Sequence, residues 1–154
     1  MKSSYLNFLR QHAPQLTPKL YPTPVVTRWN SWFKSVIYLN EYMQQIIDFL
    51  NEYEDDNSST IYLKECFEND ILTSKIQVQL TFVSEFCPKI MKLIDNLEGS
   101  NYSFAHILWS KLEDLKSSLQ RQCEGSFGEK TINILSTENS IDHSMMLKTA
   151  ALKS

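Results

Sequence analysis

Hydrophobic residues recur with the period of an α-helix over most of the chain. From Thr27 onward the spacing predicts a long helix over residues 27–53, with Thr27 placed to cap it. Its apolar stripe consists of Trp29, Trp32, Phe33, Val36, Leu39, Met43, Ile46, Ile47 and Leu50. A second amphipathic stretch predicts a helix over about residues 103–121, with Phe104, Ile107, Leu108, Leu112, Leu115 and Leu119 facing inward.

The most regular pattern lies between Lys75 and Glu98. Its apolar residues alternate spacings of four and three and form a heptad seam of Ile76, Leu80, Val83, Cys87, Ile90, Ile94 and Leu97. Such a seam predicts a helix over residues 75–98 that packs against a helical neighbour at a small crossing angle. Pro88 removes one backbone donor and predicts a kink. For Cys87 we expect the role of a small buried apolar residue.

The remaining segments are shorter and less regular. Residues 3–12 predict a short helix, and four prolines between residues 14 and 24 predict an extended connector. We expect residues 1–26 to cross the end of the bundle, and the connector to deliver the next helix to a surface without forming a core. Residues 60–72 predict one or two short helices, and residues 132–135 and 145–147 form apolar clusters that either dock or stay mobile.

Together these patterns predict an all-α fold, an irregular bundle of four to five helices. We expect a short helix plus proline-rich connector over residues 1–26, a helical bundle over residues 27–122 and a poorly defined tail over residues 123–154. The length of 154 residues fits one globular domain. No stretch approaches the roughly 20 apolar residues that a membrane span requires, so no membrane partner is expected.

The composition of the chain argues against several kinds of binding site. Only three glycines are present, and they cannot form the glycine-rich loops that cradle phosphates, which argues against nucleotide binding of that kind. The three cysteines and three histidines lack the spacing of a zinc site, so we expect no metal and no cofactor. The odd number of cysteines, after a start unlike a signal peptide, indicates a reduced, intracellular protein.

Charge is distributed unevenly along the chain. The net charge is −3, yet residues 1–40 hold five basic and no acidic residues, while residues 41–100 hold twelve acidic residues and four lysines. The basic end is where a phosphate backbone would dock, although an unevenly charged solvated surface is an equally good interpretation. No nucleophile motif of the G-x-S-x-G type is present, and the carboxylates crowd a polar loop, which argues against an enzyme.

One stretch carries a resemblance. Residues 22–42, PTPVVTRWNSWFKSVIYLNEY, place a proline-containing extended piece before Thr27-Arg28-Trp29 and a long aromatic helix. This resembles hAT-family transposases and their domesticated relatives, and a looser similarity extends through Leu93-Ile94-Asp95-Asn96-Leu97-Glu98. In that family an all-helical insertion interrupts a catalytic domain of RNase H type, and the Arg-Trp pair lies where the insertion begins.

The resemblance also implies what the chain lacks. Catalysis in that family uses three metal-binding carboxylates: two aspartates before the Arg-Trp pair, the second followed by a Cys-x-x-His element, and one glutamate after the insertion. Here the first acidic residue is Glu41, and no cysteine is followed by histidine at the third position. The resemblance therefore implies a truncated, catalytically incompetent relative that consists mostly of insertion, and a nuclear location by analogy alone.

Two functions follow as expectations. By family resemblance Trp29 stacks on an unpaired base of DNA, with Arg28 and Lys34 near phosphate, although the periodicity favours Trp29 as the first core residue of its helix. The runner-up is a protein-interaction module that binds a second copy or another helical protein through an exposed seam of Ile76, Leu80, Val83, Ile90, Ile94 and Leu97.

Overall fold

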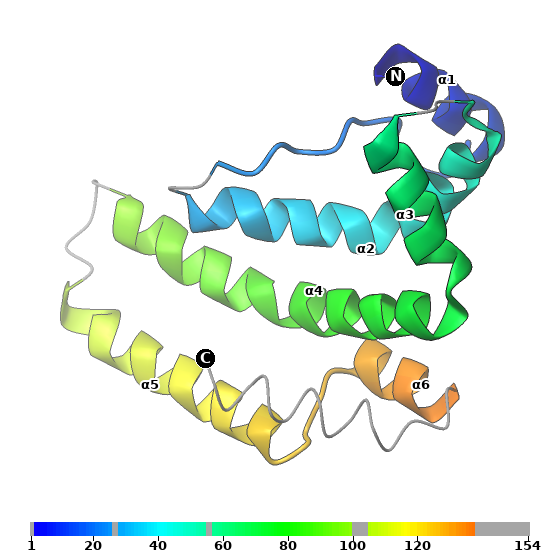
Figure 1. Ribbon diagram of the computed structural model, residues 1–154. Coiled ribbons are helices and arrows are strands. Elements are labelled where there is room, and N and C mark those ends of the chain that lie inside the picture. Colours follow the sequence, from blue (N-terminus) through cyan, green and yellow to red (C-terminus); the bar gives the residue numbers. More distant parts are fainter. Residues whose placement is uncertain (1, 26–27, 55–56, 100–104, 138–154) are drawn as a thin grey trace.

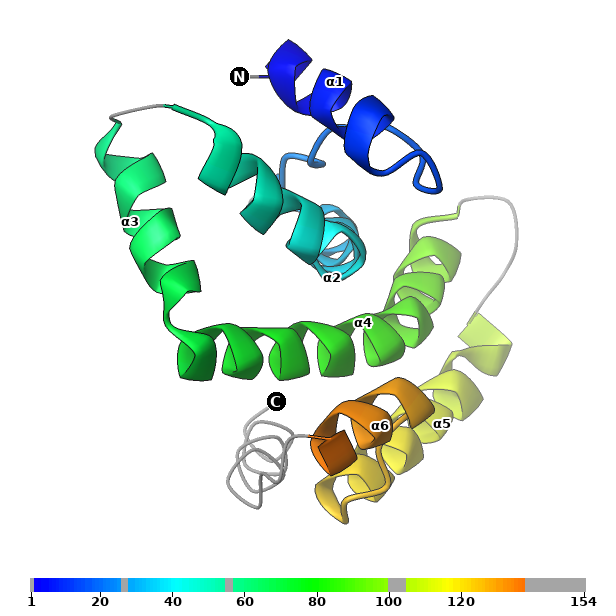
Figure 2. The same ribbon diagram turned by 90° about the vertical axis from the view of Figure 1, so that its right-hand side faces the viewer.

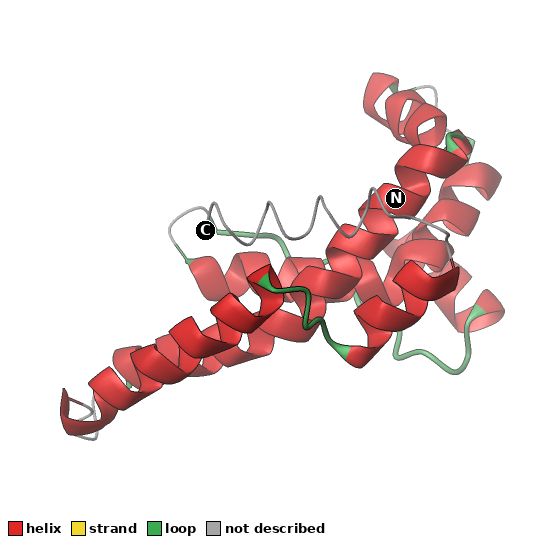
Figure 3. Cartoon of the chain, turned by 90° about the horizontal axis from the view of Figure 1, so that it is seen from below, coloured by secondary structure: helices red, strands yellow, loops and turns green. Residues whose placement is uncertain are grey.

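The computed structural model describes residues 2–25, 28–54, 57–99 and 105–137, and this part of the chain is helical (Figure 1). Its helices are α1 (Lys2–His12), α2 (Trp29–Glu52), α3 (Ser58–Glu68), α4 (Asp70–Glu98), α5 (Ala105–Cys123) and α6 (Glu129–Thr137). Helices and loops, without a strand, make up these described residues (Figure 3). The predicted all-α bundle is confirmed. The predicted N-cap Thr27 and the predicted inward residue Phe104 lie outside the described residues.

Helix α4 is the centre of the molecule. It packs along α2 and meets α3 on one side, while α5 and α6 lie on its other side (Figure 1). The helix runs without interruption through Pro88 and changes direction in its second half (Figure 2). A bend of this kind is expected where proline removes a helical hydrogen bond.

Two asparagines define the boundary that the sequence left open between residues 60 and 72. The Asn57 side chain accepts a hydrogen bond from the Ser59 N–H at 2.9 Å and starts α3. The Asn69 side chain accepts one from the Leu72 N–H at 3.1 Å and starts α4. Residues 70–72 therefore belong to the long central helix, which begins five residues earlier than the predicted residue 75.

The buried residues of α4 are mostly not those of the predicted seam. The buried residues are Val78, Thr81, Phe86 and Cys87, whereas the other seam residues are half-buried or, for Leu97, 51% exposed. The reason is that α4 has neighbours on two sides, so burial spreads over two faces. Toward α2 the contact is partly polar, because the Thr81 hydroxyl donates to Asn40 Oδ1 at 2.9 Å.

The main core cluster lies between α1 and the second half of α2. Its buried residues are Tyr5, Phe8, Leu9, Ala13, Tyr38, Tyr42 and Phe49. The rings of Tyr5 and Phe8 both meet Phe49 edge to face, at centroid distances of 5.1 and 5.5 Å. Helix α1 and Ala13 contribute four of the seven buried residues of this cluster, and the connector that follows runs back along α2.

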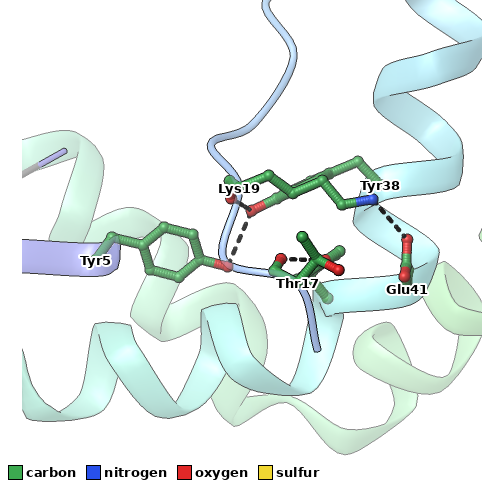
Figure 4. A network of polar contacts seen from close by, with 6 residues as sticks. Tyr5, Thr17, Lys19, Tyr38 and Glu41 are labelled. Atoms are coloured by element: carbon green, nitrogen blue, oxygen red, sulfur yellow. Dashed lines mark hydrogen bonds and ion pairs between the residues drawn. The ribbon is translucent and has the colours of Figure 1, made fainter. Parts of the chain in front are cut away.

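The proline-rich connector runs antiparallel to α2 and is held by a row of hydroxyl groups, which we call the hydroxyl row: Ser35, Tyr38 and Tyr42. Their hydroxyls donate to the carbonyl oxygens of Pro22, Lys19 and Thr17, at 2.6, 2.8 and 2.7 Å. Figure 4 shows the bond between Tyr38 and Lys19. Spacings of three and four residues place the row on one helix face. Each proline lacks an N–H donor but keeps its carbonyl, so the connector has more acceptors than donors, and the three hydroxyl groups satisfy three of these acceptors.

Helix α6 docks on α4 through one carboxylate. Glu85 accepts hydrogen bonds from the backbone N–H groups of Lys130 and Thr131 at 2.8 and 3.0 Å, and from the Thr131 hydroxyl. A negative charge at a helix N-terminus satisfies free donors and favours the helix dipole. A Cβ atom at Gly128 would collide with this carboxylate, so glycine permits the close approach.

The buried tyrosines predict a loss of stability in alkali. Burial raises the pKa of both Tyr5 and Tyr38, chiefly because the phenolate is desolvated. Below the ordinary tyrosine pKa near 10, Tyr5 and Tyr38 are protonated in both the folded and the unfolded state, and the stability of the fold is unaffected. Above pH 10 the unfolded chain loses these protons before the folded protein does, so unfolding becomes easier.

We expect the free energy of unfolding, measured by urea titration, to fall as the pH rises through about 10, and to approach a slope of about 1.4 kcal/mol per pH unit for each such group. Tyr38→Phe should be less stable at neutral pH, because the Lys19 carbonyl loses its hydrogen-bond donor. Its free energy of unfolding should nevertheless fall less steeply in alkali, because one titrating group is gone. Equal alkaline slopes for Tyr38→Phe and the unaltered protein would show that Tyr38 does not cause the loss of stability.

Candidate nucleic-acid interface at the start of α2

The start of α2 is fixed by one serine. The Arg28 N–H donates to the Val25 carbonyl at 2.9 Å, and the Ser31 hydroxyl accepts from the Val25 N–H at 2.7 Å. The same hydroxyl lies 2.7 Å from the Arg28 carbonyl oxygen, to which it can donate. Arg28 is the N-cap residue in extended conformation and makes no side-chain cap bond. Its guanidinium is therefore not used to start the helix.

The indole of Trp29 lies outside the core. Trp29 is 72% exposed, and Trp32, one turn later, is 45% exposed. The Trp32 ring meets Phe33 edge to face at 5.4 Å, and Phe33 is the first residue of α2 to be buried. The core interpretation of Trp29 is wrong. The spacing of apolar residues includes Trp29, the first residue of the helix. The end of α4 beside this turn, however, contacts α2 through a polar side chain, so the spacing does not lead to burial of Trp29.

That polar contact ties α2 to the last turns of α4. The Asn30 amide donates to Asp95 Oδ1 at 2.6 Å, across 65 positions of sequence. Asn30 Oδ1 is buried and has no hydrogen-bond partner among the described residues. The bond holds the start of α2 against the end of α4 and leaves the two tryptophans on the outside.

The two candidate cations, Arg28 and Lys34, are both exposed but lie on different faces of α2. Arg28 lies beside Trp29, whereas Lys34 follows Trp29 by five residues and therefore lies about 140° away around the helix axis. Lys19, the nearest cation on the connector, pairs with Glu41 at 3.5 Å (Figure 4). The structure thus brings together Arg28, Trp29, Trp32 and the 49% exposed Val25, which we call the tryptophan patch.

Sequence reasoning missed part of this patch. Trp32 and Val25 were not singled out as surface residues, although the three-residue spacing of the tryptophans would have placed both indoles on neighbouring positions. Lys34 belongs instead to a polar face that also carries Glu41. The patch therefore contains more aromatic surface and less charge than the sequence suggested.

A second exposed apolar surface lies on α5. Trp109 is 72% exposed, and Ile107 and Leu112, both expected to face inward, are 38% and 42% exposed. Ser118 is the buried residue among those of α5 whose burial is described. Helix α5 therefore attaches to α4 with little apolar burial and leaves part of its stripe on the surface.

The described residues offer few other candidate sites. Within the described ranges no group of three or more His, Cys, Asp or Glu side chains is arranged to hold a metal ion. The described helices include none with the length and apolar character of a membrane span. Cys66, Cys87 and Cys123 are free thiols, and burial raises the pKa of Cys87 to about 11.

Comparison with known proteins gives no relative. No family model matches the chain, and no curated protein or solved structure matches it either.

The position of Trp29 predicts its effect on stability. Trp29→Ala removes a side chain that is already in water, so the free energy of unfolding should change by no more than about 0.5 kcal/mol. Phe33→Ala, four residues later on the same helix, removes a buried ring and should cost about 3–5 kcal/mol. Urea unfolding followed by circular dichroism measures both, and a large loss for Trp29→Ala would return this residue to the core.

Proposed function

We propose that the chain is a non-catalytic helical module, related to the insertion region of hAT transposases, that contacts DNA through the tryptophan patch. The observation that carries this proposal is the exposure of Trp29. An indole 72% exposed at the first position of a helix makes no core contribution that would explain it. The competing structural explanation is thereby removed, and a role in binding gains support.

The patch has the parts that nucleic-acid contact requires. An exposed indole offers a face on which an unpaired base can stack, worth about 1–3 kcal/mol per base. The N-terminus of α2 carries free N–H donors and the positive end of the helix dipole, which favour a phosphate. Arg28 adds a planar donor that can contact two phosphate oxygens at once. A single strand or a hairpin with unpaired bases uses all three features.

DNA binding is the direct test. Fluorescence anisotropy with a labelled hairpin that carries unpaired bases should show binding in low salt that weakens steeply as salt rises. Trp29→Ala should weaken binding about tenfold, which corresponds to the lower part of the stacking range. Arg28→Gln should reduce the slope of log K against log salt by about one phosphate contact.

Helix α5 offers a matched control. Trp109 is as exposed as Trp29, at 72%, but lies on a different helix. Trp109→Ala should leave the affinity within about twofold of the unaltered protein, since surface changes outside a site have small effects. Equal losses for the two tryptophan variants, or no binding even in low salt, would reject DNA contact through this patch.

A second candidate function is self-association through α4. The seam residues Ile76, Leu80, Val83, Ile90 and Ile94 are incompletely covered, and Leu97 is 51% exposed. Incomplete cover of a heptad seam is typical of a helix that has room for another helix. This observation favours a dimer or a contact with another helical protein.

Sedimentation at increasing protein concentration tests the dimer. If the seam associates, Leu97→Lys should shift the equilibrium toward monomer, because a charge would be buried in the interface. Ile71→Lys is the control, because Ile71 lies on the same helix at its opposite end and is 69% exposed. A monomer at all concentrations would reject self-association.

A further inference from the structure

A cleft with a volume of about 760 Å³ separates the second half of α4 from α5, and we call it the α4/α5 cleft. Four of the residues that line it are cationic, Lys89, Lys92, Lys111 and Arg121, and two are acidic, Asp114 and Glu124. Its formal charge is therefore +2, in a chain whose net charge is −3. A cleft of opposite sign to the whole protein concentrates anions.

The cations come from both walls. Lys89 Nζ donates to the Ser118 hydroxyl at 2.9 Å, which fixes the two helices in register at one end of the cleft. Lys111 lies 3.9 Å from Asp114 and is partly neutralised by it. Lys92 and Arg121 make no ion pair with any described residue. Two charges of the cleft are thus available to a ligand.

The contact between α4 and α5 explains why an anion would fit here. Ser118 is the buried residue of α5 among those whose burial is described, so little apolar contact holds α5 to this part of α4. Lys89 and Lys92 give the α4 wall its excess positive charge, while on the α5 wall Lys111 and Arg121 are balanced by Asp114 and Glu124. An anion that contacts Lys92 and Arg121 would be attracted to a cation on each wall and would hold α5 against α4.

We propose that the α4/α5 cleft binds the phosphate groups of a compact polyanion, of the polyphosphate or phosphate-ester class. Arg121 presents a planar fork that matches two phosphate oxygens, and Lys92 supplies a point charge from the opposite wall. Asn96 and Ser117 add neutral hydrogen-bonding groups to the lining. The carboxylates of Asp114 and Glu124 lower the positive charge of the lining but leave it at +2.

The cleft limits the size of the ligand. Residues 89–96 form its wall on α4, and seven helical steps span about 10 Å. The cavity volume lies within the range of small-molecule sites, about 300–1,000 Å³. These dimensions favour a small phosphate compound over a nucleic-acid strand.

Sodium tripolyphosphate is the probe, titrated by calorimetry in low salt. The unaltered protein should bind it, and the double variant Lys92→Gln, Arg121→Gln should bind about a hundredfold more weakly, because each lost charge-assisted hydrogen bond is worth about tenfold or more. The control is Lys75→Gln, Lys130→Gln, which removes the same charge from α4 and α6 outside the cleft and should stay within about twofold.

Two further measurements keep the test decisive. Amide hydrogen exchange should slow in α5 when tripolyphosphate is bound, because the ligand bridges α5 to α4. Arg121→Lys keeps the charge and the fold but loses the fork, so an intermediate loss of affinity supports a specific site. Absence of binding, or equal losses in both double variants, would overturn the proposal.

The result is separable from DNA binding at the tryptophan patch. Trp29→Ala should bind tripolyphosphate as the unaltered protein does, because Trp29 does not line the cleft. A single-stranded oligonucleotide that binds through Lys92 and Arg121, while tripolyphosphate does not bind, would overturn the assignment to a compact ligand.

Discussion

The hydroxyl row of α2 is the interaction on which the rest of the fold depends. An extended connector rich in proline has more carbonyl acceptors than N–H donors, and it would lose hydrogen bonds to water if it packed against an apolar surface. Ser35, Tyr38 and Tyr42 supply the missing donors at three successive positions on one helix face. The connector can therefore follow α2 backward, and α1 reaches Phe49 to complete the core cluster.

This arrangement gives α2 partners on more than one face and leaves its start outside. One face of the helix meets the connector and α1, another meets α4, and α3 also packs against it. The Arg28 N–H is bonded to the Val25 carbonyl where the connector meets the helix, so the first helical turn lies at the edge of these contacts. The tryptophan patch is the surface consequence of that turn, since aromatic residues at the first turn extend past the apolar neighbours of the later turns.

How much the sequence could predict depended on whether the determining contact was local. Helical period identified α2, α4 and α5, and the proline spacing identified the connector. The place of Trp29 could not follow from period, because period does not tell where a partner helix ends. The docking of α6 depends on Glu85, 45 positions before Lys130, and a contact of that range leaves no local pattern. Likewise, Lys92 and Arg121 look like ordinary surface cations until antiparallel packing places them on facing walls.

The last turns of α4 connect the two surfaces for which we propose ligands. Asp95 holds Asn30 at the start of α2, while Lys92 and Asn96 line the cleft toward α5. The bend in this half of the helix, together with buried Phe86 and Cys87, determines where both groups lie. A ligand that fixes α5 need not move α2, because α4 is already held on its other side by the Asn30–Asp95 bond. Because α4 does not have to move when either ligand binds, the binding energies at the two surfaces should be close to additive.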